Sequence, residues 1–382
     1  MFKKTIAIVA TASVIFGAIP AFAAPGTDLK AIPVIVNGQK VKFPDTEPYI
    51  SAAGNTMVPV RFVSEKLGAD VKWDNTTQTV LISYNGKNIR MSVGSKEVSV
   101  DGVVSTLDTS AEIYDTRTMV PLRFVSEVLG SEVIWDQGAH SVRVTDAAYK
   151  AKVDSGEVEL DPWGRELSQT QDTSWYRLTD LEPTNFYSFY SQYKTSRTFI
   201  TPKYARNDIY KDHADVLANK IRSYYEAQLN VDYRTINETD FVNAFMKSAS
   251  GKITMDAYLK SEWTKVLKSY VAWVKKNKVI AKGYADPEPM AIFTILGPIV
   301  WYPVHFKFMI LSSVDTAQTF ADNWNVSSNS ESFKLKTGVW YNGYSVISMT
   351  SVGANDSWSD KFGLRTLENM FSFDMFFYDY DK

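Results

Sequence analysis

The sequence predicts an α+β protein whose N-terminal domain is made of two duplicated β-hairpin, helix and strand units. Its C-terminal α+β domain should carry a long helix packed on a curved antiparallel sheet. The first supporting observation is the segment "TMVPVRFVSEKLGADVKWD" at 56–74, which returns 62 residues later as "TMVPLRFVSEVLGSEVIWD" with 14 of 19 positions identical. The second is that helical patterns after residue 183 are followed by long alternating strands.

The chain begins with the features of a secretory signal peptide. Lys3 and Lys4 precede an apolar run from Ile6 to Ile19, and the small-residue triplet at 21–23 follows. This order predicts a signal peptide at 1–23, cleaved after Ala23. No later stretch is long and apolar enough to span a bilayer, so we expect a secreted, extracellular protein without an integral membrane segment, with cell-wall association an option.

Composition narrows the class of protein further. The chain has no cysteine, which excludes disulfides and an acylated cysteine at the cleavage site, so buried apolar surface must stabilise the fold. The formal charge is −2, and neither half of the chain has an excess of Lys and Arg. A nucleic-acid partner is not expected, because it would need a clustered positive surface.

Each copy of the repeat predicts a short strand, a helix and a further strand. A proline suits the strand exit or first helical turn, and a glycine suits the end of the helix. Hairpins with Asn37-Gly38 and Asp101-Gly102 turns lie upstream. One unit has too few apolar residues to enclose a core, so two should pack together over 33–145. The repeated motif residues are Pro59, Arg61, Phe62, Gly68, Trp73 and Asp74, and then Pro121, Arg123, Phe124, Gly130, Trp135 and Asp136.

This doubled motif resembles the copper amine oxidase N-terminal-like domain, a stalk-type module common in exported proteins of Gram-positive-type bacteria. Both copies keep the Val-Pro-x-Arg-Phe, Leu-Gly and Trp-Asp elements in order. The resemblance implies an extracellular, often envelope-associated module without catalysis of its own. It does not imply an amine oxidase, because the chain lacks an Asn-Tyr pair for a quinone cofactor and has three isolated histidines, His140, His213 and His305. No metal or other cofactor is expected.

Arg61 and Arg123 allow two interpretations. They could bind a ligand as a symmetric pair, or they could form structural ion pairs over packed Trp73 and Trp135 side chains. Identical surroundings favour structure, since a repeat preserves what its core needs. The candidate partners are Asp74 or Glu65 in the first copy and Asp136 or Glu127 in the second.

Residues 146–183 lose clear periodicity and predict a linker with some ordered contacts. Trp163 in "DPWGR" is expected to pack as a staple rather than to serve as a ligand platform. In the domain at 184–382 the apolar periodicity predicts three helices. The longest of them, at about 254–277, has a broad apolar stripe. Strands follow, with Asn342-Gly343 predicted as a two-residue hairpin turn and the last residues as an edge strand.

No sequence motif in the C-terminal domain names a reaction. Asp286 and Glu288 could form a carboxylate pair for sugar hydrolysis, but the flanking prolines favour an exposed turn. His305 could act as a base, and a partly buried structural histidine fits its alternating strand at least as well.

The sequence therefore favours a secreted, non-catalytic binding protein, envelope-associated or extracellular, with the duplicated module as stalk or docking domain. The expected partner is a cell-wall polymer or another exported protein. The alternative is a secreted hydrolase that acts on cell-wall or extracellular polymer through the C-terminal domain, in a concave pocket with His305 or paired carboxylates.

Overall fold

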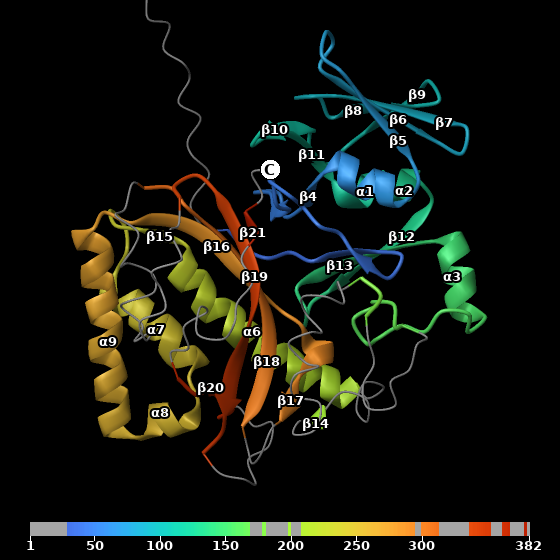
Figure 1. Cartoon of the computed structure of the whole chain (residues 1–382). Helices are drawn as coiled ribbons and strands as arrows, with labels where there is room; N and C mark the ends of the chain where they lie inside the picture. Colours follow the sequence, from blue (N-terminus) through green and yellow to red (C-terminus); the bar gives the residue numbers. More distant parts are fainter. Residues whose placement is uncertain are drawn as a thin grey trace, which may run out of the picture.

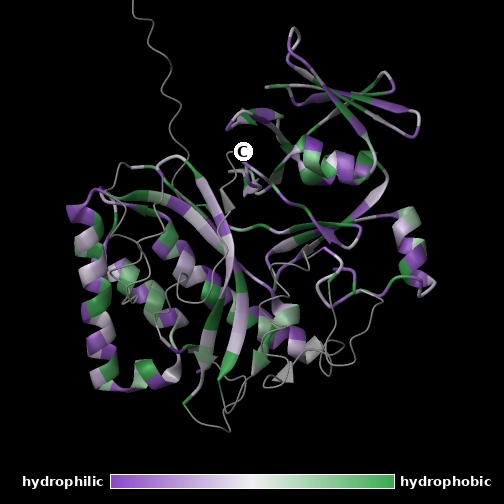
Figure 2. Ribbon diagram, viewed as in Figure 1, coloured by the Kyte–Doolittle hydropathy of each residue, from purple (hydrophilic) through white to green (hydrophobic). Residues whose placement is uncertain are grey.

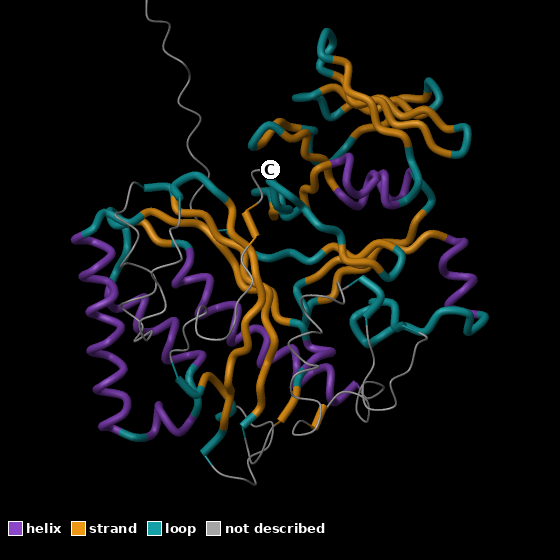
Figure 3. Tube along the Cα trace, viewed as in Figure 1, coloured by secondary structure: helices purple, strands orange, loops and turns teal. Residues whose placement is uncertain are grey.

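A computed structural model describes residues 29–168, 178–180, 198–199, 208–294, 299–312, 336–352, 361–366 and 378–379. The expected signal peptide lies outside these residues. Figure 1 shows two parts, a β-rich N-terminal part with two short helices and a C-terminal part in which helices pack on a long, curved sheet. Figure 3 shows that most helical residues lie in the C-terminal part. The α+β class predicted from the sequence is confirmed.

The two repeats meet in a sheet at the centre of the N-terminal part. In this sheet β11 (Arg117–Pro121) pairs antiparallel with β4 (Thr56–Pro59), with β10 (Glu112–Tyr114) and β3 (Tyr49–Ile50) outside them. Val58 lies opposite Val120, and the neighbouring pairs are Met57 with Pro121 and Pro59 with Met119. Because these pairs interchange when 62 is added or subtracted, a pseudo-twofold axis passes between Val58 and Val120.

The repeats also exchange strands with each other. The hairpin of β1 (Val34–Val36) and β2 (Gln39–Lys40) joins β12 (Ser131–Asp136) and β13 (Ser141–Asp146) of the second copy in one sheet. A second sheet runs in the order β5 (Asp70–Asp74), β6 (Thr79–Tyr84), β7 (Lys87–Ser92), β8 (Glu97–Val100) and β9 (Val103–Thr106). Both copies contribute to a single apolar cluster, so neither repeat has a complete core of its own.

The motif prolines and glycines have the predicted roles. Pro59 and Pro121 directly precede α1 (Val60–Lys66) and α2 (Leu122–Val128), with φ of −61° in both. Gly68 and Gly130 follow the helices with φ of +86° and +80°, a conformation in which glycine avoids the steric cost of a side chain. The two helices lie side by side, between the β5–β9 sheet and the sheet that contains β12 and β13 (Figure 1).

The segment after the second repeat is more ordered than an extended linker. It contains α3 (Ala147–Asp154), and Trp163 is only 3% exposed. The Trp163 Nε1 donates to Asp215 Oδ1 at 2.7 Å, and its ring contacts Tyr210 edge to face. Trp163 therefore packs into the C-terminal core, as the sequence predicted for this tryptophan.

The C-terminal sheet is antiparallel. It runs from β14 (Thr198–Phe199) through β17 (Phe293–Thr294), β18 (Val300–Ile310) and β16 (Ile280–Pro287) to β15 (Val231–Asp232). Beyond β18 lies β19 (Trp340–Thr350), which pairs with β20 (Gly363–Leu364) and β21 (Tyr378–Asp379), and η1 (Pro289–Ala291) follows β16. Only this short β21 represents the predicted C-terminal edge strand, whose other residues lie outside the described part of the chain.

The long helix that packs on the sheet is α6 (Asp208–Leu229), through contacts such as Tyr225 with Phe306 at 4.8 Å between ring centroids. The predicted apolar face of this helix, including Leu217, Ile221 and Tyr224, is buried. Behind it lie α7 (Glu238–Ser248), α8 (Gly251–Met255) and α9 (Ala257–Lys276). Figure 2 shows α9 with polar residues interspersed among apolar ones.

Two predictions for this part need correction. The apolar stripe of α9 is narrower than predicted, because α9 packs on α7 and α8 and leaves Tyr258 71% exposed. Asn342 and Gly343 do not form a turn but lie inside β19, opposite Lys307 and Phe306. The turn prediction was wrong because β18 pairs with β19 over ten consecutive positions, and Asn342 Oδ1 is bound by the His305 ring 2.7 Å away.

Candidate functional site

The two motif arginines are not equivalent in the structure. Arg61 Nε lies 3.7 Å from Glu65 Oε1, and both side chains are about half exposed, 48% and 51%. The predicted ion pair with Glu65 therefore forms, but on the surface, where such pairs contribute little to stability. Arg123 is also exposed, and its predicted partner Asp136 instead lies 3.0 Å from the Lys211 Nζ. Among the described residues Arg123 forms an ion pair with neither candidate partner, Asp136 or Glu127, so the predicted structural ion pair of the second repeat is wrong.

The motif tryptophans are not core residues. Trp73 is 36% exposed and Trp135 is 41% exposed, so the interpretation of packed tryptophans beneath the arginines is also wrong. Each ring sits on an edge strand, β5 or β12, and near its C-terminal end. The helices α1 and α2 contact β5 and β12, where Val71 is buried and its counterpart Val133 is partly buried.

The remaining motif residues make contacts within the fold. Phe62 and Phe124 are partly buried against the shared apolar cluster. Asp74 accepts from the Thr76 backbone N–H at 2.9 Å and so closes the turn after β5. Asp136 accepts from the Ala139 N–H at 3.1 Å in the same way.

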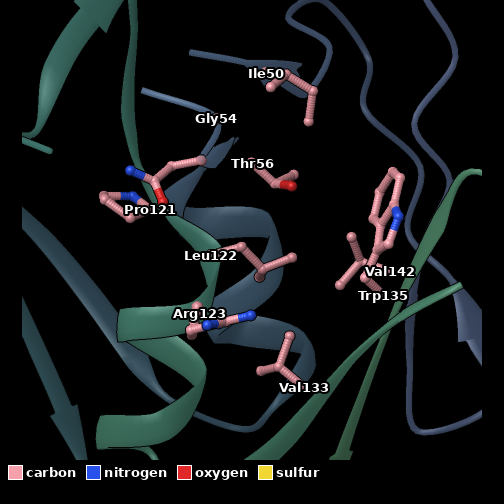
Figure 4. A pocket seen from close by; sticks show the side chains of 10 residues that line it. Ile50, Gly54, Thr56, Pro121, Leu122, Arg123, Val133, Trp135 and Val142 are labelled. Atoms are coloured by element: carbon pink, nitrogen blue, oxygen red, sulfur yellow. The ribbon is translucent and has the colours of Figure 1, made fainter. Parts of the chain in front are cut away.

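A pocket of about 480 Å³ opens between the repeats (Figure 4). The first repeat contributes Ile50, Gly54, Asn55 and Thr56 from the β3–β4 region. The second repeat contributes Pro121, Leu122 and Arg123 from the start of α2, and Val133, Trp135 and Val142 from the sheet beside it. We call this site the Arg123 pocket. Leu122 and Arg123 extend from α2 toward the side on which Val133 and Trp135 lie (Figure 4).

The wall of the Arg123 pocket combines one cation with apolar side chains. Most of its wall is aliphatic, and Arg123 is the one ionisable residue among those that line it. The indole of Trp135 is stacked with His140 at 6.5 Å and 13°, and its Nε1 donates to Gln137 at 3.0 Å, which orients the ring. A cation beside an apolar wall suits an organic anion.

The corresponding place in the other copy is filled differently. The residues that line the pocket from the second repeat have counterparts at Pro59, Val60, Arg61, Val71, Trp73 and Val80 in the first. On the opposite wall, however, Arg117 takes the position that corresponds to Asn55. Its Nε donates to Asp45 Oδ1 at 3.0 Å, and its guanidinium lies 5.4 Å above the Phe62 ring. The duplication has therefore diverged at this site.

A second polar site lies at the junction of the two parts, around Asp286 and Glu288. These carboxylates are 5% and 1% exposed, so the prediction of an exposed turn is wrong. The reason is that β16 continues through Pro287, where it pairs with Val304, and the hairpin of the first repeat covers it. Lys40 of that hairpin pairs with both carboxylates, at 3.0 Å for Glu288.

The junction cluster is balanced in charge. Arg165 pairs with Glu288 and donates to Asp180 at 2.7 and 3.1 Å, and Arg222 lies 3.8 Å from Asp286. Burial works against the charged form of Asp286, but Lys40 and Arg222 outweigh it and lower the pKa of this carboxyl. Three cations thus face the three carboxylates of Asp180, Asp286 and Glu288, which supports a structural role.

His305 lies next to this cluster. It is partly buried, faces Asp286 in the strand register, and its Nε2 bonds with Asn342 Oδ1 at 2.7 Å. Burial lowers the pKa of His305, so the ring is neutral near pH 7. In the part of the chain that the structure describes, no group of three or more His, Cys, Asp or Glu side chains has an arrangement that could hold a metal ion. Nor is any described helix long and apolar enough to cross a membrane.

The interface also contains a buried lysine that the sequence did not single out. Lys307 of β18 is 1% exposed and reaches the first repeat, where its Nζ pairs with Glu47 and donates to the Phe43 carbonyl at 2.7 Å. Burial raises the pKa of Glu47, and Lys307 offsets part of this rise. A signal for this contact exists in the sequence, because Lys307 interrupts the otherwise apolar end of the strand "VWYPVHFKFMI".

The fold of two interleaved repeats defines the N-terminal part as a duplicated, β-rich module. Residues 35–144 match the family model of the copper amine oxidase N-terminal domain, and this part of the chain is a domain of that family. A curated relative, a protein named "Protease inhibitor" from Brevibacillus choshinensis, is 29% identical over 105 residues. The match covers 28% of this chain and 32% of the relative, so the chain spans about a third of the relative's length.

Proposed function

We propose that this chain is an exported, non-catalytic binding protein of the cell envelope or the extracellular space. Its duplicated domain serves as the docking module, and the Arg123 pocket holds part of a partner. The observation that carries the proposal is the composition of that pocket, in which one guanidinium and one half-exposed indole stand among aliphatic side chains. None of the ten lining residues is an Asp, Glu, His, Cys or Lys that could act as an acid, a base or a strong nucleophile.

The junction cluster supports the same proposal over a hydrolase. A hydrolase of the retaining or inverting type needs two carboxyl groups that can reach substrate and exchange protons. Asp286 and Glu288 are instead buried and paired with Lys40, Arg165 and Arg222. Their use in catalysis would leave buried cations unpaired, which is costly.

Co-sedimentation of the purified mature chain with isolated Gram-positive cell walls tests the proposal, with a parallel pull-down against the proteins of a culture supernatant. We expect the chain to be retained by one of the two materials and to release no soluble fragments from the walls. Failure to bind either material would contradict the proposal. Release of wall fragments would instead support the hydrolase.

Because the curated relative is named "Protease inhibitor", an exported protease is one candidate partner of this chain. Hydrolysis of casein by a secreted serine protease can be measured with and without a molar excess of the chain. A dose-dependent loss of activity would identify the exported-protein partner as a protease. Unchanged hydrolysis would leave the wall and the other supernatant proteins as the partners under test.

A further inference from the structure

We infer that the Arg123 pocket binds the free carboxylate end of a peptide whose last residue has an apolar side chain. This inference rests on the proposed function, since it names the ligand class of the same site. It follows from the charge of the pocket, from its walls and from the difference between the two repeats.

The charge of the pocket fits one carboxylate. Arg123 is the single ionisable group on the wall, so a ligand with one negative charge balances it, whereas a phosphate dianion would leave a charge unmatched. A guanidinium presents parallel N–H donors that match the two oxygens of a carboxylate. The ligand should therefore place a carboxylate at Arg123.

The walls fit an apolar group close to that carboxylate. Leu122 and Val133 flank Arg123, and the Trp135 indole closes one side of the pocket (Figure 4). The volume of about 480 Å³ falls in the usual range for sites that hold small molecules, which is suited to the end of a peptide rather than to a folded segment. Thr56 adds a hydroxyl that can bond with a peptide group.

The same walls fit a sugar less well. A sugar ring needs several polar partners for its hydroxyls, and besides Arg123 and Thr56 the polar side chain on the wall is that of Asn55. The Asn55 Nδ2 already donates to the Thr109 hydroxyl at 2.7 Å. The pocket therefore favours a peptide terminus over a glycan.

The first repeat shows which group pairs with the arginine at this position. Arg61, the counterpart of Arg123, has the Glu65 carboxylate as its partner. Glu127 occupies the position equivalent to Glu65, but within the described residues no ion pair joins it to Arg123. Of the two equivalent arginines, Arg123 is therefore the one whose guanidinium can pair with a carboxylate from another molecule.

Isothermal titration calorimetry on the mature full-length chain tests the inference with four probes. These are N-acetyl-L-Leu-L-Leu and N-acetyl-D-Ala-D-Ala, each as the free acid and as the C-terminal amide. We expect at least one acid to bind, and its amide to bind at least about tenfold more weakly, because the amide cannot form a charge-assisted hydrogen bond with the guanidinium. Preference for the L acid points to a protein C-terminus, and preference for the D acid points to a wall peptide.

Two variants make the test specific to the site. Arg123→Gln should weaken binding of the preferred acid at least about tenfold, while Arg61→Gln, at the equivalent surface position of the other repeat, should change it less than about twofold. Both variants should keep the parent melting temperature, since both side chains are exposed. Absence of binding by both acids at millimolar concentration, equal binding of acid and amide, or equal effects of the two variants would overturn the inference.

The wall co-sedimentation separates this inference from the proposed function. If the parent chain and the Arg123→Gln variant bind walls or an exported protein equally well, the ligand assignment fails and the proposed function stands. If the chain binds neither material, the proposed function fails whatever the dipeptides show.

Discussion

The Lys307 Nζ donates a hydrogen bond to the carbonyl oxygen of Phe43 at 2.7 Å, across a sequence separation of 264 residues. The same ammonium pairs with Glu47, and it lies 4.9 Å from the centroid of the Trp340 ring. The lysine of a C-terminal strand is thus buried in the first repeat of the N-terminal domain. This contact, together with Lys40 at Asp286 and Glu288, makes the junction a polar but closed interface.

The first prediction concerns this lysine. Lys307→Met should lower the free energy of unfolding by about 3–5 kcal/mol, because Glu47 would remain buried without its cation. Thermal and denaturant unfolding of the full chain measure the loss. The double variant Lys307→Met with Glu47→Gln should recover part of it, since the unpaired charge is then gone. An equal loss in the single and double variants would show that the ion pair is not the source of the stability.

The second prediction concerns the dependence of stability on pH. Burial raises the pKa of Asp161 to about 7, above its usual 3.8, although the Arg165 and Trp163 N–H groups bond with its Oδ1. The folded state therefore holds a proton that the unfolded state releases. The corresponding stability is fully present below about pH 4 and is lost as the pH rises through about 7.

Asp161→Asn should remove this contribution, because an amide keeps the Oδ1 acceptor and cannot ionise. At about pH 8 the variant should be more stable than the parent by at least about 1 kcal/mol, and the difference should shrink toward pH 4. Melting curves across this range provide the test. Asp154→Asn, at a carboxylate with a 62% exposed side chain, is the control and should follow the parent. A parallel pH profile for Asp161→Asn and the parent would contradict the prediction.

The third prediction compares three tryptophans. Trp73→Ala and Trp135→Ala should each cost less than about 1.5 kcal/mol, because both rings are more than one third exposed. Trp163→Ala should cost about 3–5 kcal/mol, since it empties a buried site and removes the donor to Asp215. Chemical denaturation of the three variants ranks them. A similar loss for all three would mean that the motif tryptophans stabilise the domain despite their exposure.

The fourth prediction concerns the interdependence of the repeats. A fragment from Pro33 to Thr145 should unfold cooperatively, while neither repeat alone should, because β1 of the first copy pairs with β13 of the second. Circular dichroism during thermal melting of the three fragments measures this. A cooperative transition in an isolated repeat would show that the exchanged hairpin is dispensable.

The fifth prediction concerns export. N-terminal sequencing of the protein recovered from culture medium or washed cell wall should begin at Ala24 with Ala-Pro-Gly. Accumulation of the full-length chain in the cytosol would contradict the expectation of a cleaved signal peptide.

The amino-acid sequence by itself determined the duplication, the family of residues 35–144 and the α+β class. It also located Pro59, Pro121, Gly68 and Gly130 correctly at the ends of the helices. These features depend on local backbone preferences and on apolar periodicity, which are determined by residues close together in the sequence. The buried face of α6 was predictable for the same reason.

Only the tertiary structure decided which polar residues meet. Asp286 and Glu288 are buried because Lys40, Arg165 and Arg222 approach from distant parts of the chain, which no local pattern records. Trp135 lies on the edge strand β12 and is 41% exposed, although the same ring could have filled a core. Arg123 and Arg61 have nearly identical sequence surroundings, yet Asn55 faces one site and Arg117 takes its place at the other. Burial and ion pairing depend on long-range contacts, so two copies of one sequence motif can form two different sites.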